Sequence, residues 1–305
     1  MSLDAISTFA DAAAPLIAGS FGLLFGSFLN VCIYRSQHDL SIVRPARSFC
    51  PACSRTIAWY DNLPVLSYLL LRGRCRHCAQ TISVRYPIVE LATAILFALI
   101  VELNGFSLLA LKWCVLASLL TVLLWTDLEG RLLPDEFTLG GTLLGLVFAA
   151  FVPPPSGLLT GLIPGVPERI EWLFAAGAAA AILTLPMLLI GWLYQLLRGR
   201  SGLGLGDIKL LALIGVFLGL EAGLAALLIG SVTGSIAGLI YIRVRRLDPR
   251  SYWLPYGSFL CLGALICIFL PRSHDLVLSE ARTDFSLVYD RALSHEGTSE
   301  GAHSR

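Results

Sequence analysis

Charged side chains are scarce in this sequence: Asp, Glu, Lys and Arg together make up 14% of its 305 residues, against roughly 25% in an ordinary soluble domain. This scarcity excludes a typical soluble globular protein. The formal net charge of +1 gives no reason to expect nucleic acid or another polyanion as a partner. Hydrophobic residues, in contrast, make up 56% of the chain. The composition predicts an all-α polytopic membrane protein, with the lipid bilayer as its surroundings.

Basic residues are missing ahead of the first apolar run, where the sequence is MSLDAISTFADAAAP. A cleavable signal peptide has a positive charge there, so we expect the first span to be retained. A membrane-spanning helix needs ~20 mainly apolar residues. About eight stretches meet or approach this length, with the sixth and seventh separated at Glu221: 13–34, 87–103, 106–126, 132–152, 172–197, 208–220, 222–242 and 253–270.

The spans and the polar stretches divide the chain into four parts. We assign 1–34 to the N-terminus and first transmembrane helix, and 35–86 to a polar domain. The range 87–270 is a core of seven helices, and 271–305 is a polar tail that we expect to be disordered. If eight spans alternate, 16 of the 22 Lys and Arg residues fall on the side of 35–86. Basic loops stay on the cytoplasmic side, so this face is predicted to be cytoplasmic.

Two aspartates lie where an apolar span meets a polar turn: Asp127 in LLWTDLEGRLLPDEFT and Asp207 in GLGLGDIKLLALIG. The predicted topology places both at the cytoplasmic face and at one depth. A carboxylate near hydrocarbon is costly, which marks it as a functional-site candidate. Two carboxylates a few Å apart share a proton, so one can act as a base on water and the other as an acid. Gly202, Gly204 and Gly206 would let a substrate backbone approach.

Structural roles compete with this interpretation. Asp207 after a glycine is also a common N-cap, and Asp127 is spaced to pair with Arg131 at i,i+4. Asp135 after Pro134 is the second candidate for the partner, although it also suits a first-turn acid that complements a helix dipole. The matched depth favours Asp127 and Asp207 as the catalytic pair. A proton-coupled transporter is the alternative function, but both carboxylates lie at one membrane edge and not at the midplane.

Four of the eight cysteines form two CxxC pairs in the polar domain, Cys50-Pro-Ala-Cys53 and Cys75-Arg-His-Cys78, with 21 residues between them. This spacing is typical of zinc ribbons, and four thiolates would close the coordination shell of a structural Zn²⁺. A reducing cytosol disfavours two disulfides. His77 could replace one ligand, but its arginine neighbours favour a solvated residue. The sequence therefore predicts a zinc-ribbon-like insertion between the first two spans.

Together these motifs resemble the type IV prepilin peptidases, or leader peptidase/N-methyltransferases, which are GxGD-type intramembrane aspartic proteases. The resemblance runs from about Gly26 to Gly263 and includes GSFLNVCIYR, CPAC, DNLPVLSYLLLRGRCRHC, ISVRYPIVEL, DLEGRLLPD, GLGDIKLLALIG and LPYGSFLCLGA. It implies eight spans in the bacterial inner membrane. It also implies that Asp127 and Asp207 are a catalytic pair facing the cytoplasm, and that the four cysteines named above form the family's tetracysteine site.

The resemblance implies a reaction as well. The family removes the basic leader from prepilins and pseudopilins after a glycine, and commonly methylates the new N-terminus with S-adenosyl-L-methionine. The methyl donor enters by resemblance alone, because the sequence has no Rossmann-type GxGxxG unit that would locate its site. The complete cysteine block favours the bifunctional form. One departure is Ser258, where the family pattern has proline; we expect it to affect the packing of the last span and not the chemistry.

Overall fold

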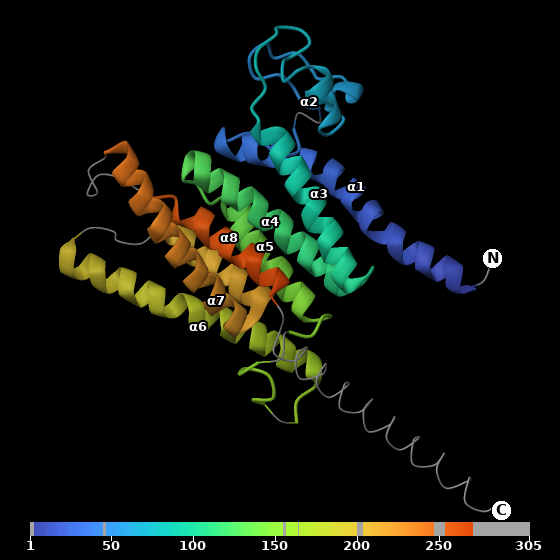
Figure 1. The fold of residues 1–305 in the computed structure, drawn as a ribbon. Coiled ribbons are helices and arrows are strands. Elements are labelled where there is room, and N and C mark those ends of the chain that lie inside the picture. Colours follow the sequence, from blue (N-terminus) through green and yellow to red (C-terminus); the bar gives the residue numbers. More distant parts are fainter. Residues whose placement is uncertain are drawn as a thin grey trace, which may run out of the picture. The chain divides into compact units, whose positions relative to one another are not determined.

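The computed structural model describes residues 3–44, 47–154, 157–163, 165–199, 204–246 and 254–270, with side chains from residue 13 onward. The regular elements of these residues are helices, as predicted, and within the described residues only two isolated β-bridges occur. Figure 1 shows the elements, which in chain order are α1 (Leu3–Gln37), the 3₁₀ helix η1 (Trp59–Asn62), α2 (Leu66–Leu70), α3 (Arg85–Asn104), α4 (Leu108–Gly130), α5 (Asp135–Ala149), α6 (Glu168–Arg198), α7 (Leu205–Arg245) and α8 (Tyr256–Phe269).

Five of the described helices are long and apolar enough to cross a membrane: α1 from Ala13 onward, α3, α4, α6 and α7. Two other helices are shorter: α8 is apolar and has 14 residues, and α5, which begins with two acidic residues, has 15. All of these helices coincide with predicted spans. The prediction of an all-α polytopic membrane protein is therefore confirmed, while the number of eight spans stays a prediction.

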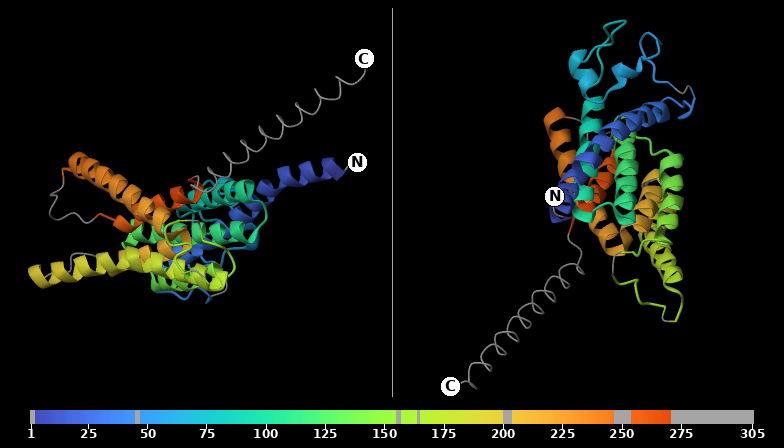
Figure 2. Two further views of the ribbon diagram at one scale, coloured as in Figure 1. Left: turned by 90° about the horizontal axis from the view of Figure 1, so that it is seen from below. Right: turned by 90° about the vertical axis from the view of Figure 1, so that its right-hand side faces the viewer.

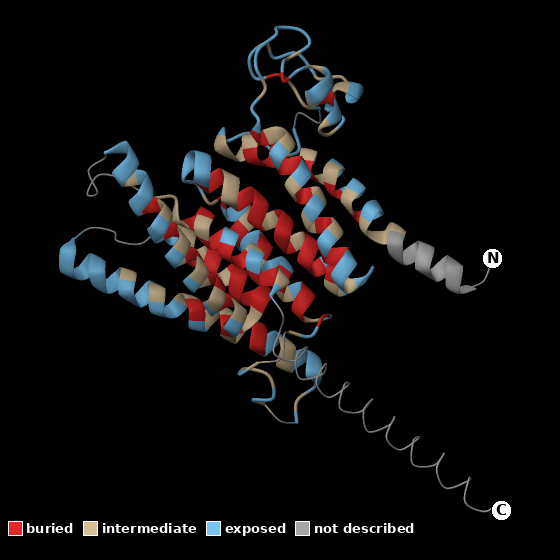
Figure 3. Ribbon diagram, viewed as in Figure 1, coloured by how far each residue is buried: buried red, intermediate tan, exposed pale blue. Residues whose placement is uncertain are grey.

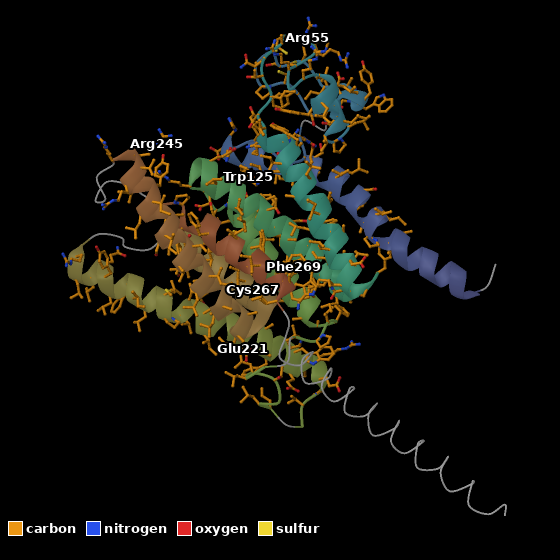
Figure 4. All side chains as sticks on the ribbon, viewed as in Figure 1. Arg55, Trp125, Glu221, Arg245, Cys267 and Phe269 are labelled. Carbon is orange, nitrogen blue, oxygen red and sulfur yellow. The ribbon has the colours of Figure 1, made fainter. Side chains whose placement is uncertain are left out.

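One helical run, α7, contains two of the predicted spans, 208–220 and 222–242. Gly219 interrupts it with φ 81° and ψ −175°, a conformation that residues with a side chain rarely adopt. The break comes two residues before the boundary predicted at Glu221. In Figure 4, Glu221 and Arg245 mark opposite ends of the half that follows the break.

The two halves of α7 run in opposite directions, and their contacts with α5 and α8 show this. The first half runs parallel to α5, because side chains of Leu213 and Phe217 contact Gly141 and Gly145 in the same order. The second half runs antiparallel to α8: Gly230 faces Leu260, and eight residues later Gly238 faces Leu254. The chain thus turns back at Gly219, and both ends of α7 lie toward the start of α8.

The core of the bundle is centred on α4, where 13 of 23 residues are buried. Figure 3 shows this concentration of buried residues along α4 and the neighbouring part of α7. Glycines let helices approach closely: a Cβ added at Gly26 of α1 would lie 2.7 Å from the Cα of Glu90 in α3. The tight packing follows from small residues at helix contacts, as is usual within membranes.

The connection between α1 and α3 is the predicted polar domain, and it carries η1 and α2. Figure 2 shows it standing apart from the helical bundle in its right-hand view. Two anchors attach it. Arg35, buried in the last turn of α1, donates to the carbonyls of Ser41 and Ile42 at 3.0 and 2.7 Å, and Glu90 of α3 accepts the Val65 N–H at 2.8 Å.

Residues Phe269–Arg305 form a second unit. The predicted tail, 271–305, lies outside the described residues.

Candidate active site and metal centre

Asp127 lies in the last turn of α4, and capping interactions at both ends of the helix determine where it begins and ends. Ser107 caps the start of the helix by accepting the Ala110 N–H at 3.1 Å. The helix ends where Arg131 adopts the left-handed conformation with φ 53°, and its N–H bonds to the Asp127 carbonyl at 2.8 Å. The Asp127 side chain is only 5% exposed, so it faces the interior of the bundle.

Ser258 holds the Asp127 carboxylate in place. Oδ2 of Asp127 accepts the backbone N–H of Ser258 at 2.6 Å and lies 2.8 Å from the Ser258 hydroxyl, which is also 3.0 Å from the Leu124 carbonyl. The Ser258 N–H is in the first turn of α8, where backbone donors lack partners within the helix and the dipole favours negative charge. Asp127 therefore caps α8 from a neighbouring helix, so Ser258 contacts a predicted site residue, while its expected lack of effect on the chemistry stays a prediction.

Asp207 is half-buried in the first turn of α7. Leu133, in the turn after α4, packs near both Asp207 and Asp127. A Cβ added at Gly206 would lie 3.1 Å from Leu133, and one added at Gly257 would lie 3.0 Å from the same side chain and 3.2 Å from the Asp127 carboxyl. Leu133 thus packs between the starts of α7 and α8. Both aspartates belong to the segments that meet around it.

The two carboxylates are also coupled electrostatically. The charge of Asp127 acts on Asp207, and both charges act on the buried thiol of Cys261 in α8. Tyr256, at the start of α8, interacts with Asp207 and shares a hydrogen bond of 3.0 Å with Ser231 in the second half of α7. Segments that are far apart in the sequence therefore meet at one end of the bundle, as the shared depth of Asp127 and Asp207 predicted.

The other residues proposed near this site have separate partners. Asp135, the second candidate, is exposed and accepts from Lys209 at 2.7 Å, which ties the start of α5 to the first turns of α7. Each of the two charges therefore has its partner in an ion pair at the surface, between α5 and α7. Of the three glycines ahead of Asp207, Gly202 lies outside the described residues.

The four cysteines predicted as metal ligands come together in the polar domain. Sγ atoms of Cys50, Cys53, Cys75 and Cys78 all lie within 4.8 Å of one another, and those of Cys50 and Cys78 are 3.8 Å apart. Tetrahedral zinc with Zn–S distances of about 2.3 Å places its sulfurs about 3.8 Å apart. The arrangement fits such an ion, and all four cysteines are free of disulfides.

Two similar turns present these thiols. In the first, Cys50 N–H bonds to Arg55 and Ser54 N–H bonds back to Cys50, and the bridge Phe49 to Thr56 closes the turn. In the second, the same pattern joins Cys75 to Gln80 and Ala79 to Cys75, closed by the bridge Arg74 to Thr81. Each turn therefore positions a pair of sulfurs, as expected for a zinc-ribbon-like insertion.

The electrostatics of the second turn favour a charged sulfur at Cys75. Backbone N–H groups of Cys78 and His77 hydrogen-bond the Cys75 sulfur and lower the pKa of Cys75 to about 7. At Cys78, in contrast, a backbone hydrogen bond from Gln80 lowers the pKa less than desolvation and the neighbouring sulfurs raise it, and the result is a pKa of about 11. A thiolate, not a thiol, binds zinc. Next to it, Arg76 forms an ion pair with Asp61 of η1, with Nε to Oδ2 at 2.8 Å, and this hydrogen bond lowers the pKa of Asp61. His77 is exposed and bonds to Arg55 at 3.3 Å, so it lies outside the sulfur cluster.

Comparison with known proteins identifies the family of this chain. Residues 20–103 match the bacterial peptidase A24 N-terminal domain, and residues 114–239 match the type IV leader peptidase family. The chain is 40% identical to a prepilin leader peptidase/N-methyltransferase of Klebsiella pneumoniae, over 68% of this chain and 88% of the relative. This chain belongs to the type IV leader peptidase family. A relative of the same name from Pseudomonas putida is 35% identical over 83% of this chain and 89% of its own length.

A third relative, the prepilin leader peptidase/N-methyltransferase of Myxococcus xanthus, is 40% identical over 75% of this chain and 64% of its own length. No solved structure matches the chain. The family membership confirms the resemblance stated from the motifs, and it gives no support to the alternative of a proton-coupled transporter.

Proposed function

We propose that this protein is an aspartic endopeptidase that removes the leader from type IV prepilins and pseudopilins after a glycine, with Asp127 and Asp207 as its catalytic pair. One observation carries the proposal: two acidic side chains 80 residues apart in the sequence converge on Leu133 at the end of the bundle and interact electrostatically. The family and the names of the relatives support the substrate class.

In the proposed reaction, a water molecule between the carboxylates attacks the carbonyl carbon of the scissile peptide bond. Asp127 accepts a proton from this water, because the Ser258 N–H and hydroxyl stabilise the negative charge on its Oδ2. Protonated Asp207 donates a hydrogen bond to the carbonyl oxygen as that oxygen gains charge. The proton held by Asp127 then passes to the leaving nitrogen. One member of the pair thus starts as base and the other as acid.

The membrane orientation follows from charge. We propose that the protein lies in the bacterial inner membrane with Asp127 and Asp207 facing the cytoplasm, since 16 of 22 basic residues fall on that side in the eight-span topology. A prepilin has a basic leader followed by an apolar helix. Its scissile bond would therefore lie at the membrane boundary, the depth predicted for both aspartates.

The tetracysteine cluster is proposed to hold Zn²⁺ in a structural role. Cys50, Cys53, Cys75 and Cys78 would supply four thiolates, which leaves no open coordination position for substrate or water. The ion would stabilise the polar domain, as metal binding and folding are coupled in small domains of this kind.

We further propose that S-adenosyl-L-methionine serves as methyl donor for N-methylation of the cleaved product, on the strength of the relatives' printed names. Both activities can be tested in one experiment. The purified protein in proteoliposomes is incubated with a type IV prepilin and S-adenosyl-L-methionine, and the product mass is measured. Loss of the leader together with a gain of one methyl group is expected. An intact prepilin would overturn the peptidase assignment, and a cleaved but unmethylated product would overturn the methylation.

A further inference from the structure

Leu133 lies in the turn that joins α4 to α5, between the segments that carry the two aspartates. Its Cδ1 methyl is 3.1 Å from the position that a Cβ would take at Gly206, the residue before Asp207. The same methyl is 3.0 Å from the Cβ position of Gly257, which itself lies 3.2 Å from the Asp127 carboxyl carbon. A single methyl group thus packs against the backbone beside each aspartate, and the proposed mechanism gives it no role.

The backbone on both sides of Leu133 is held in place. On one side, Arg131 ends α4 in the left-handed conformation, and its N–H bonds to the Asp127 carbonyl. On the other side, Pro134 is the N-cap residue of α5, and its carbonyl accepts the Phe137 N–H at 3.2 Å. The proline ring also fixes its own φ angle. A side chain on so restrained a turn keeps its position when a substrate arrives, as a size filter requires.

The groups around Leu133 leave little room for a further side chain. Non-bonded carbon atoms ordinarily lie ~3.5–4.0 Å apart, so a Cβ at Gly206 or Gly257 would already be too close to Leu133. A Cβ at Gly204 would lie 3.1 Å from Oδ2 of Asp207. Glycines therefore line the site where larger residues would collide with it. A substrate residue that enters the same space meets the same limit.

The substrate residue before the scissile bond must enter this space. Its Cα is bonded to the reacting carbonyl carbon at ~1.5 Å, and that carbon must come within ~3–3.5 Å of the attacking water. Because Leu133 lies between the segments that hold the two carboxylates, a Cβ on this substrate residue would have to share the space beside Leu133. Glycine has no Cβ and needs no such space.

We propose that Leu133 determines the substrate specificity of the protein by excluding any residue larger than glycine immediately before the scissile bond. The inference rests on the proposed peptidase function, and it names the side chain that enforces the glycine. An alanine at that substrate position would press against Leu133 and hold its carbonyl carbon away from the aspartate pair. Attack by the water between the carboxylates would then be slow, because the reacting atoms could not reach the required distance.

The test uses two prepilins that differ only in having glycine or alanine before the scissile bond. Each is incubated with the purified full-length protein in proteoliposomes, and kcat/KM is measured. The parent should prefer the glycine prepilin by roughly 10–200-fold, the range that one carbon atom accounts for in a close-fitting pocket. Leu133→Ala removes the crowding methyl group, so this preference should fall about tenfold or more, through faster cleavage of the alanine prepilin.

Two further variants make the test specific. The valine side chain is shorter than that of leucine, so the preference of Leu133→Val should lie between those of the parent and Leu133→Ala. Leu132 is the preceding residue and has the same side chain, but it is 41% exposed, so Leu132→Ala should keep the preference of the parent. Should Leu133→Ala lose all cleavage because the turn is loosened, the preference of Leu133→Val decides the question.

The outcomes separate this inference from the proposed function. An unchanged glycine preference in an active Leu133→Ala protein would overturn the inference, because glycine would then be selected for its backbone conformation and not for its size. Loss of cleavage of both prepilins in both Leu133 variants, with normal cleavage by Leu132→Ala, would also overturn it and leave Leu133 as a residue that positions the aspartates. Failure of the parent to cleave the glycine prepilin would instead reject the peptidase proposal itself.

Discussion

The aspartate pair and the cysteine cluster are held in place in different ways. Asp127 lies on α4, where 13 of 23 residues are buried, so its position is fixed by packing against other helices. Between residues 47 and 84, by contrast, the buried residues are Cys50, Ser67 and Gly73. A segment with so small a core cannot offset its conformational entropy by burial. The difference indicates that the bundle depends on its own packing, and it supports the proposal that a zinc ion stabilises the polar domain.

The largest effect is expected from the bundle site. Asp127→Asn and Asp207→Asn keep the size of each side chain but remove its acid–base function. Each should lower the rate of leader removal about a thousandfold, since a positioned acid or base contributes roughly 10²–10⁴-fold. The measurement is single-turnover cleavage of a prepilin by the purified variant in proteoliposomes.

Asp135→Asn is the matched control for these variants. Asp135 is an aspartate at the same end of the bundle, but it is exposed and paired with Lys209. We expect cleavage to stay within about twofold of the parent, because an exposed ion pair contributes ~0–1 kcal/mol. Should Asp135→Asn lose cleavage while Asp127→Asn keeps it, the pair would have to be reassigned to Asp135 and Asp207.

The next largest effect is expected from the polar domain. Cys50→Ser, or removal of metal with a chelator, should abolish zinc binding and expose 47–84 to protease. The helix content measured by circular dichroism should stay nearly constant. Structural zinc contributes about 10–16 kcal/mol to small zinc-dependent folds, far more than the burial in this segment could replace. Metal analysis and limited proteolysis check both parts of this prediction.

Cys114→Ala serves as control, because Cys114 is a buried thiol of α4 that is outside the cluster. It should retain full zinc content and normal protease resistance. Undiminished zinc in Cys50→Ser, or a protease-resistant segment after metal removal, would contradict a structural metal. The comparison between the two regions would then have to be abandoned.

Much of both regions could be predicted from the sequence because their signals are local. Apolar length located the helices, CxxC spacing located the four thiols, and polar breaks located Asp127 and Asp207. The turn in α7 was also predicted, and Gly219 explains it because the backbone there requires a conformation suited to glycine. The family membership confirms the resemblance that these motifs indicated.

The contact between Ser258 and Asp127 could not be predicted in this way. The two residues are 131 positions apart, and no sequence signal near Ser258 indicates that its N–H lies in the first turn of a helix, without a partner in that helix. The pairing of Arg85 in α3 with Glu129 in α4 likewise joins residues that are far apart in the sequence. Both cases concern polar groups whose partner comes from a different helix, and periodicity carries no information about such partners.

A moderate effect is expected from Ser258. Ser258→Ala removes one donor to Asp127 and should lower cleavage about fivefold, whereas Ser258→Pro removes both donors and should lower it tenfold or more. Proline is tolerated in the first turn of a helix, so α8 should still form. With fewer donors stabilising the charged base, the acidic limb of the pH–rate profile should move to higher pH, and further in Ser258→Pro. An unchanged profile in both variants would reduce Ser258 to a packing residue.

The smallest effect is expected from the ion pair of Asp61 and Arg76 in the polar domain. The hydrogen bond from Arg76 lowers the pKa of Asp61, so the pair stabilises the folded domain above the unfolded pKa of ~3.9 and loses this contribution as pH falls through the lower, folded value. Arg76 is 51% exposed, so solvent screening keeps the effect small. In Asp61→Asn, the urea concentration at which proteinase K cuts the segment should fall slightly. The decrease should be the same at pH 5.5, 7 and 8, because both pKa values lie below this window. A decrease that differs between these three pH values would mean that another titrating group stabilises the domain. The thiols of the four clustered cysteines would then be tested first.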